Sequence, residues 1–167
     1  MEKFGAKVYN QYADLIAYDG TILKSRNIIG AYKPESKKRI LLCAHWDSRP
    51  YADNDPDPKN HHTPILGVND GASGVGVLLE IARQIQKEQP ALGIDIVFLI
   101  RRIMEFLNFM TVDTNKTLVP WFTILARTPH VQNYNARYGI LLDMVGGKDA
   151  TFYYEGYSAR TARSEMK

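Results

Sequence analysis

Three features that mark other classes of protein are scarce in this sequence. It has one cysteine, Cys43, so no disulfide can form within the chain, and the apolar run around this residue predicts a buried thiol. No apolar stretch approaches the roughly 20 residues that a membrane-spanning helix needs. The net charge is only +3, and the longest basic cluster, KPESKKR, is typical of a solvated turn. We therefore expect no membrane span and no nucleic-acid partner.

The rest of the composition is that of an ordinary globular protein. The 167 residues are 45% hydrophobic and 23% charged, and they contain no repeats or low-complexity segments. This length is sufficient for a hydrophobic core, so we expect a single domain over residues 1–167. The N-terminal stretch MEKFGAKVYN lacks the apolar core of a signal peptide, and the cellular location stays open.

Alternating or continuous apolar patterns predict six strands along the chain. The first two flank the turn pair Asp19-Gly20 and are expected to form a hairpin. The runs RILLCAHW, IDIVFLI and YGILLDMV are almost continuously apolar, which is typical of strands buried on both faces of a sheet. The six predicted strands are 7–18, 21–33, 39–46, 94–100, 138–145 and 151–158.

A loop and a helix separate the third and fourth predicted strands. Residues 49–64 are rich in Pro, Asp and Asn, so we expect a loop in which His61 and His62 are solvated. Apolar residues at helical spacing predict a helix over 74–89, which ends before Pro90. The order strand, helix, strand predicts an α/β fold, a three-layer αβα sandwich with a mixed, mostly parallel sheet. In such sheets, ligands bind at the carboxyl ends of the strands.

A histidine and an aspartate end the third predicted strand. His45 and Asp47 are two residues apart, so on a strand their side chains would point to the same face. One role for such a pair is a metal-binding imidazole whose tautomer is held by the carboxylate. The other interpretation is a strand-end histidine that is hydrogen-bonded to a neighbouring aspartate without any metal.

Two further carboxylates stand at the ends of predicted elements. Asp70 precedes the small residues GASG, which let the backbone come close to whatever the carboxylate holds, although Asp is also a favoured helix N-cap. Asp143 follows the run YGILL, where a carboxylate needs an ion partner, a cleft or a metal. Imidazole and carboxylate groups at three such ends on one edge of a sheet favour a zinc site.

These stretches together resemble a known family. AHWDSRP, YADNDPDPKNHHTPILGVNDGASG and YGILLDMVGG are similar to the zinc-dependent aminopeptidase and glutaminyl cyclase family, above all to its bacterial glutaminyl-peptide cyclotransferase-like members. The resemblance runs from about Tyr18 to the end of the chain, apart from one segment. It implies a zinc-dependent enzyme that acts on the N-terminal end of peptides or proteins. It also implies a zinc-exopeptidase-like domain that is incomplete at both ends, in a family whose members are commonly exported.

The resemblance assigns roles to the four residues. It implies that Asp70 is a zinc ligand, and that His45 is a ligand in the two-metal aminopeptidases but a near neighbour of the metal in the one-metal cyclases. Asp47 would be the partner of His45. Asp143 would be the catalytic carboxylate of a cyclase, or a ligand of the second metal in an aminopeptidase. Cyclases convert an N-terminal glutamine into pyroglutamate, whereas the aminopeptidases hydrolyse the first peptide bond with zinc-activated water.

Residues 100–125 depart from the family pattern. After the strand IDIVFL the family has an acidic motif, D-x-E-[DE], which supplies the general base and a zinc ligand, whereas this chain has Arg101 and Arg102. A guanidinium is always charged and would repel a metal ion. Glu105 is the one carboxylate nearby, and we expect it to be an ordinary helix or loop residue. We therefore expect the chain as written to be inactive, which leaves a binding or structural domain without catalysis as an alternative.

A change of reading frame would explain this departure. Read from the third base of each codon, Leu99–Glu105 can encode D-S-E-D-Y-G, and LVPWFTIL read from the second base can encode W-C-L-G-S-Q-Y-W. Most of these letters are merely permitted by codon degeneracy, but three are forced and agree with the family pattern. Met104-Glu105 must give Gly, Met110-Thr111 must give Asp and Trp121-Phe122 must give Gly. We hypothesise that residues 100–125 are translated out of frame, and a divergent insertion is the alternative.

Overall fold

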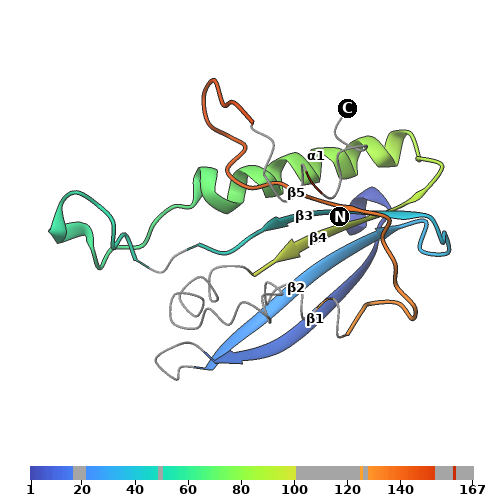
Figure 1. The fold of residues 1–167 in the computed structure, drawn as a ribbon, viewed down its shortest axis with the longest axis horizontal. Coiled ribbons are helices and arrows are strands. Elements are labelled where there is room, and N and C mark those ends of the chain that lie inside the picture. The colour runs from blue at the N-terminus through green and yellow to red at the C-terminus, as the bar shows by residue number, and fades with distance from the viewer. Residues whose placement is uncertain (17–21, 49–50, 101–124, 126–127, 153–159, 161–167) are drawn as a thin grey trace.

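The structure, a computed structural model, describes residues 1–16, 22–48, 51–100, 125, 128–152 and 160. A five-stranded sheet of order β1-β2-β4-β3-β5 forms the centre of this part, and the helix α1 lies across one of its faces (Figure 1). The strands are β1 (Lys7–Ile16), β2 (Ile22–Tyr32), β3 (Arg39–His45), β4 (Gly93–Leu99) and β5 (Gly139–Leu141), and α1 spans Ser73–Lys87. Short helical turns are η1 (Glu2–Phe4), η2 (Pro58–Asn60) and η3 (Val68–Ala72).

β1 and β2 form the antiparallel hairpin that the sequence predicts. Their register runs from Lys7 opposite Ala31 to Ile16 opposite Ile22. The predicted turn pair, Asp19-Gly20, lies outside the described residues. β2 also pairs antiparallel with β4, so the hairpin extends the sheet on the side away from β3.

The middle of the sheet is parallel. β3 pairs in parallel with β4 on one side and with β5 on the other. α1 lies between β3 and β4 in the sequence and provides the crossover that parallel neighbours require. All residues of β4 are buried, and so are all residues of β3 except Ile40, as their continuous apolar runs predict.

β5 differs from the prediction. It is three residues long and all three are exposed, so the expected burial of this strand is wrong. The physical reason is its position: β5 has β3 on one side, and no other described strand lies on its outer side. The last predicted strand, 151–158, falls mainly outside the described residues, and residues 151–152 are not in a strand.

The α/β class and the mixed sheet are confirmed. The described strands make two antiparallel and two parallel pairings, so this part of the sheet is evenly mixed rather than mostly parallel. Among the described helices, none is long and apolar enough to cross a membrane.

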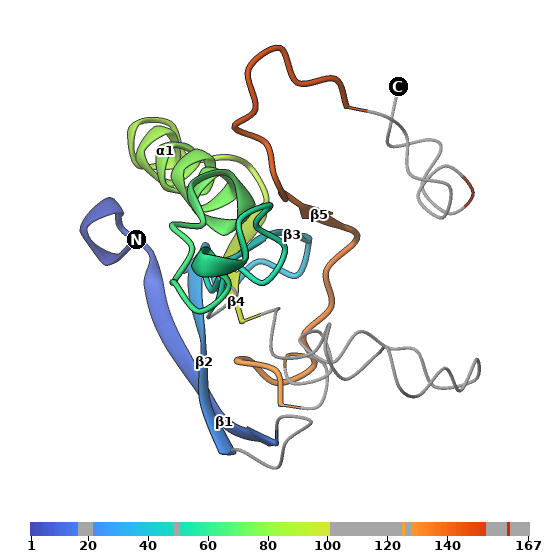
Figure 2. The same cartoon turned by 90° about the vertical axis from the view of Figure 1, so that its left-hand side faces the viewer.

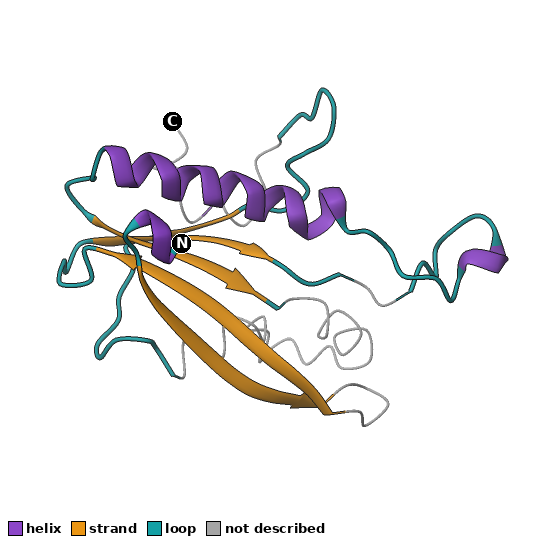
Figure 3. Cartoon of the chain, turned by 180° about the vertical axis from the view of Figure 1, so that it is seen from behind, coloured by secondary structure: helices purple, strands orange, loops and turns teal. Residues whose placement is uncertain are grey.

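α1 lies against one face of the sheet (Figure 1 and Figure 3), and it buries an apolar stripe there. Leu78, Ala82 and Ile85 follow helical spacing and are buried. They pack against side chains of β3 and β4, namely Leu42, Ala44, Ile94, Ile96 and Phe98. The helix ends at Lys87, close to the predicted end, because Pro90 restricts the chain that follows.

The opposite face of the sheet carries a second apolar cluster. Its buried members are Ile29, Leu41, Cys43, Val97, Leu99 and Leu125. Cys43 is 1% exposed, which confirms the predicted buried thiol, and burial raises its pKa to about 12. Alternate residues of β3 and β4 therefore belong to two different cores, because successive side chains of a strand point to opposite faces. Figure 2 shows α1 on one side of the sheet and the segment that leads into β5 on the other.

Leu78 and Leu79 are a matched pair for testing this packing. Leu78 is 0% exposed in the core under α1, whereas Leu79 is 36% exposed on the outer side of the helix. Leu78→Ala is expected to lower the free energy of unfolding by about 2–5 kcal/mol, because it leaves a cavity. Leu79→Ala is expected to lower the free energy of unfolding by roughly 1 kcal/mol or less. Urea denaturation followed by circular dichroism measures both, and equal losses would contradict this orientation of α1.

Candidate metal centre

Three side chains from separate parts of the chain meet at one edge of the sheet. His45 is the last residue of β3, Asp70 lies in η3 just before α1, and Asp143 follows the end of β5. Because β3 and β5 are parallel, their carboxyl ends lie at the same edge. The structure thus brings together the three residues that the sequence indicates as candidates.

The imidazole of His45 lies at the centre of this group. Its Nε2 is 3.0 Å from Oδ1 of Asp70 and 3.3 Å from Oδ1 of Asp143. One possible ligand atom from each residue lies within 4.8 Å of the other two. The His45 side chain is 1% exposed, whereas those of Asp70 and Asp143 are 26% and 25% exposed. The group is therefore buried on the side of the imidazole and open to solvent on the side of the carboxylates.

Asp47 contacts the other nitrogen of the same ring. Nδ1 of His45 is 3.1 Å from the backbone oxygen of Asp47 and 3.4 Å from its Oδ1. Both oxygens are acceptors, so Nδ1 donates its hydrogen to them, and a neutral ring then has its lone pair on Nε2. β3 ends at His45, so this contact comes from the course of the chain after the strand rather than from strand periodicity. The carbonyl contact could not have been predicted from the sequence pattern.

The donor set fits a zinc ion. Zinc binds imidazole nitrogen and carboxylate oxygen at about 2.0–2.2 Å, and tetrahedral angles then separate two ligand atoms by about 3.3 Å. The two distances from Nε2 are 3.0 Å and 3.3 Å. A metal-binding histidine normally donates its other ring N–H to a carbonyl or carboxylate, as His45 does. An imidazolium paired with carboxylates has similar distances, so this geometry suits both a metal centre and an ion-pair cluster.

The backbone of η3 brings Asp70 close to His45. Gly71 has a φ of +104°, which side chains rarely permit, and a Cβ there would lie 3.0 Å from both the His45 ring and the Asp47 backbone oxygen. The N-cap position of α1 is Ala72, so Asp70 lies before the cap, and the simple N-cap interpretation is not supported. The predicted close approach at the small residues is therefore found at Gly71.

Two polar side chains, Asn69 in η3 and Ser73 at the start of α1, hold the turn that follows β5. The backbone N–H of Gly146 donates to Oδ1 of Asn69 over 2.8 Å, and that of Val145 donates to Oγ of Ser73 over 3.1 Å. These bonds join the two segments that carry the carboxylates of the site. The sequence does not predict that Asn69 and Ser73 accept these hydrogen bonds. The one signal in it is that both are small polar residues close to Asp70 in GVNDGAS.

The remaining candidates lie apart from this group or outside the described residues. His62 is exposed, as predicted, whereas His61 is partly buried, and its Nε2 lies 2.9 Å from the backbone oxygen of Asp55. Neither histidine belongs to the group around His45. The segment 101–124, where the sequence departs from the acidic motif, lies outside the described residues.

An open hollow of about 240 Å³ lies beside the site. Its lining includes Asp47 together with the apolar side chains of Trp46, Leu66 and Val75. Trp46 is 40% exposed and is held in place because its Nε1 donates to the backbone oxygen of Arg26 over 3.2 Å. The hollow gives a solvent-accessible, partly apolar surface next to the residue that supports His45.

Comparison with known proteins identifies the family. The sequence model of peptidase family M28 matches residues 27–102, which include His45 and Asp70. The glutaminyl cyclase of Bacteroides thetaiotaomicron, solved with bound N-acetylhistamine, is 60% identical over 98% of this chain, with a TM-score of 0.84. Residues 27–102 of this chain match peptidase family M28, and solved bacterial glutaminyl cyclases and Zn-dependent exopeptidases are similar over nearly the whole chain.

Two further relatives show how much of an M28 protein this chain represents. A Zn-dependent exopeptidase of Parabacteroides distasonis ATCC 8503 is 55% identical over 98% of the chain, with a TM-score of 0.87. The uncharacterised protein YfbL of Escherichia coli (strain K12) is 38% identical over 72 residues, which are 43% of this chain and 21% of that protein. The chain covers 56% of each of the two solved structures, so it spans little more than half of their length.

Gly74 and Gly76 test the close packing of α1 at the site. A Cβ at Gly74 would lie 2.5 Å from the backbone oxygen of Leu142 and 2.9 Å from Cβ of Ala44, whereas one at Gly76 would meet nothing within 4 Å. Gly76→Ala is expected to raise the free energy of unfolding by about 0.5–1 kcal/mol through helix propensity. Gly74→Ala is expected to lower it by roughly 1–3 kcal/mol through overpacking. Chemical denaturation checks both, and equal gains would contradict this packing.

Proposed function

We propose that this chain is part of a zinc-dependent enzyme of the glutaminyl-peptide cyclotransferase type, which acts on the N-terminal end of peptides or proteins. The observation that carries the proposal is the convergence of His45, Asp70 and Asp143, with ligand atoms within 4.8 Å, at the carboxyl edge of the sheet. The relatives support it, because one is a glutaminyl cyclase and another a Zn-dependent exopeptidase. The open hollow beside Asp47 supplies room for a peptide chain.

Each residue of the group has a role in this proposal. Asp70 and His45 would hold the zinc ion; His45 is placed among the ligands because its Nε2 lies 3.0 Å from Oδ1 of Asp70, whereas the resemblance gives it as a neighbour of the metal in the one-metal cyclases. Asp47 keeps the imidazole hydrogen on Nδ1 so that Nε2 presents its lone pair. Asp70 and His45 would thereby hold a zinc ion that, when bound, would supply Lewis-acid polarisation of the side-chain amide of an N-terminal glutamine. Asp143 is the catalytic carboxylate: it would hold the α-amine of the substrate while the amine nitrogen forms a bond to the amide carbon and the bond from that carbon to the amide nitrogen breaks. One proton passes from the amine to the leaving nitrogen, which departs as ammonia. The general base would come from the acidic motif that residues 100–125 lack as written.

A two-zinc aminopeptidase is the second candidate. It is favoured by the position of Asp143, whose Oδ1 lies 3.3 Å from Nε2 of His45, the atom that Asp70 also contacts. The exopeptidase among the relatives favours it too. In that enzyme Asp143 would bind a second ion, and zinc-activated water would attack the first peptide bond. Counting the bound metal ions separates the two, because two tightly bound ions contradict the cyclase.

A catalytically inactive binding or structural domain is the third candidate. It is favoured by Arg101 and Arg102, which stand in the sequence where the family has acidic residues. In this case the fold and the cleft persist, but the chemistry is lost. Zinc-dependent cyclisation of a glutaminyl peptide by the purified chain would exclude it.

The finer architecture is also a proposal. We propose that residues 1–167 belong to one zinc-exopeptidase-like domain with three αβα layers. The described part supplies the sheet and one helical layer, α1. The apolar cluster around Val97 and Leu99 on the opposite face supports a further layer, because apolar surface on a sheet must be covered.

Zinc binding tests the assignment of the ligands. Isothermal titration of the metal-free chain with zinc is expected to show weaker binding, by at least tenfold, in Asp70→Asn and in His45→Gln, because each removes a ligand. Asp14→Asn is the matched control, since Asp14 is an exposed aspartate paired with Lys24 on the hairpin. Unchanged affinity in both site variants would contradict the assignment.

The reading-frame hypothesis predicts the DNA sequence of the gene. Resequencing across codons 95–130 is expected to restore D-x-E-D and W-C-L-G-S-Q-Y-W in a single frame. A protein made from the corrected gene is then expected to cyclise a glutaminyl peptide with zinc, whereas the chain as written is not. An uninterrupted frame that encodes Arg101 and Arg102 would overturn the hypothesis and favour the inactive domain.

A further inference from the structure

A buried carboxylate in β4 takes no part in the candidate metal centre. Asp95 is 0% exposed, and strand alternation places it on the face of the sheet opposite α1, between Ile94 and Ile96, which face the helix. Burying an ionised carboxylate is costly unless charged or hydrogen-bonding partners surround it. The partners of Asp95 therefore show which parts of the chain this residue holds together.

Arg39, the first residue of β3, pairs with Asp95 through two parallel hydrogen bonds. Its Nε donates to Oδ2 and its Nη2 donates to Oδ1, each over 2.7 Å, and the Arg39 side chain is 4% exposed. The same guanidinium donates to the backbone oxygens of Tyr32, Lys33 and Ser36. The charge of Asp95 is therefore compensated by a fully bonded arginine within the sheet.

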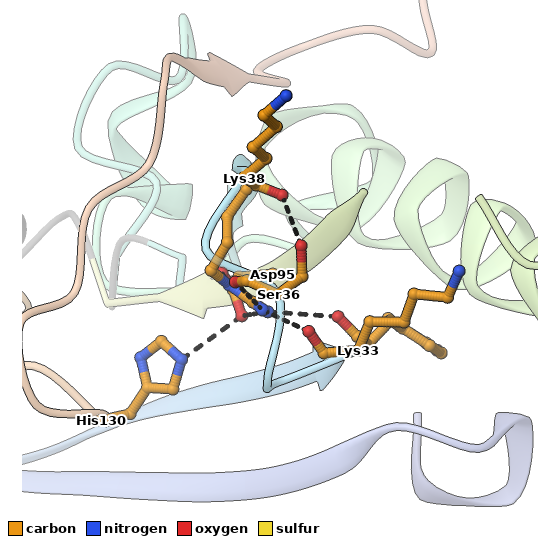
Figure 4. A network of polar contacts seen from close by, with 7 residues as sticks. Lys33, Ser36, Lys38, Asp95 and His130 are labelled. Atoms are coloured by element: carbon orange, nitrogen blue, oxygen red, sulfur yellow. Dashed lines mark hydrogen bonds and ion pairs between the residues drawn. The ribbon is translucent and has the colours of Figure 1, made fainter. Parts of the chain in front are cut away.

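His130 is a third member of this network and comes from a distant part of the chain (Figure 4). Its Nε2 lies 3.3 Å from Oδ1 of Asp95, a close contact without hydrogen-bond geometry, and its side chain is 1% exposed. The ring lies between those of Tyr9 in β1 and Tyr134, with centroid distances of 5.1 Å and 4.8 Å. Burial raises the pKa of Asp95, but the contacts with His130 and Arg39 outweigh it, so the pKa lies below its usual value. We call Arg39, Asp95 and His130 the buried latch.

The segment that carries His130 leads directly into β5. The backbone N–H of Arg137 donates to the oxygen of Arg39 over 2.8 Å, and that of Leu41 donates to the oxygen of Tyr138 over 3.0 Å. Arg39 thus bonds to this segment through its backbone while its side chain holds Asp95. The start of the β3–β5 pairing and the latch therefore share one residue.

The register of β5 decides where Asp143 lies. β5 pairs with β3 through three residues, and the last bond before Asp143 runs from the N–H of Leu142 to the oxygen of Cys43 over 2.8 Å. So short an edge strand specifies its own register weakly, and a slip of one residue would turn each side chain to the opposite face. The bonds of Asn69 and Ser73 hold the chain after Asp143, so an anchor on the other side, before β5, would complete the fixing of its register.

We propose that the buried latch is this anchor: His130, packed between two tyrosine rings and in contact with Asp95, fixes the register of β5 on β3 and so places Asp143 beside His45. The consequence for metal binding rests on the proposed function, whereas the structural part stands on the contacts of the latch alone. His130 is a positioning residue in this account, because it touches neither the metal ligands nor the hollow. Asp95 already has a compensating charge in Arg39, so the contact with His130 is not required to bury the carboxylate.

The substitution His130→Phe in the full chain tests the proposal. Phenylalanine keeps a ring between Tyr9 and Tyr134 but cannot pair with Asp95. Amide hydrogen exchange, measured by NMR, is expected to become at least tenfold faster at Leu41, Arg137 and Leu142, while the amides of the β2–β4 pairing keep their protection. Zinc affinity is expected to fall roughly tenfold in the same variant, as for other residues that orient a metal site.

Two further variants complete the experiment. His130→Gln retains an N–H group that can reach Asp95, so it is expected to keep most of the protection in β5. His62→Phe makes the same change as His130→Phe at an exposed loop position, and it is expected to alter neither exchange nor zinc binding.

Three results would overturn the proposal. They are unchanged exchange in β5, equal loss of protection throughout the sheet, and local loosening of β5 with zinc affinity retained. The first two contradict the anchor itself, and the third contradicts its effect on Asp143. A wild-type chain that binds no zinc would contradict the proposed function instead. The hydrogen-exchange data alone would then decide whether the buried latch fixes the register of β5.

Discussion

The parallel pairing of β3 with β5 is the interaction on which the candidate site depends. β3 is buried along almost all of its length and ends in His45, whose ring is fixed by Asp47 on one side. β5 runs beside it in the same direction, so the next residues of the chain bring Asp143 to the same edge. The loop before α1 adds Asp70 from the third direction. Loss of this one pairing would separate the carboxylates although the hairpin, β3, β4 and α1 could still form.

β3 connects two polar groups of different character. At its start, Arg39 compensates a buried carboxylate and bonds to the segment that leads into β5. At its end, His45 faces two carboxylates that are open to solvent. The apolar residues between them belong to the cores on the two faces of the sheet. A closed ion-pair network suits a structural role, whereas the open one has the exposure and the donor types that a metal ion and a substrate need.

Sequence patterns predict the elements whose burial is determined locally. The hairpin, β3, β4 and α1 follow from alternation, continuous apolar runs and helical spacing, because each of these patterns reflects which faces are covered. The three candidate residues stand out in the sequence because His45 and Asp143 come at the ends of apolar runs and Asp70 precedes the small residues that open α1. β5 was mispredicted as buried, since its sequence does not reveal that no described strand covers its outer side. The contact between His130 and Asp95 joins residues that lie far apart in the sequence, so no local pattern contains it.

The most direct test of this account is a crystal structure of the chain soaked with zinc, with anomalous diffraction recorded at the zinc edge. The account predicts an anomalous peak in contact with Nε2 of His45 and a carboxylate oxygen of Asp70, with Asp143 adjacent. Such a peak would show that the open end of β3 is a metal centre. An ordered site without any peak there, with His45 hydrogen-bonded to the carboxylates as an imidazolium, would contradict the central claim.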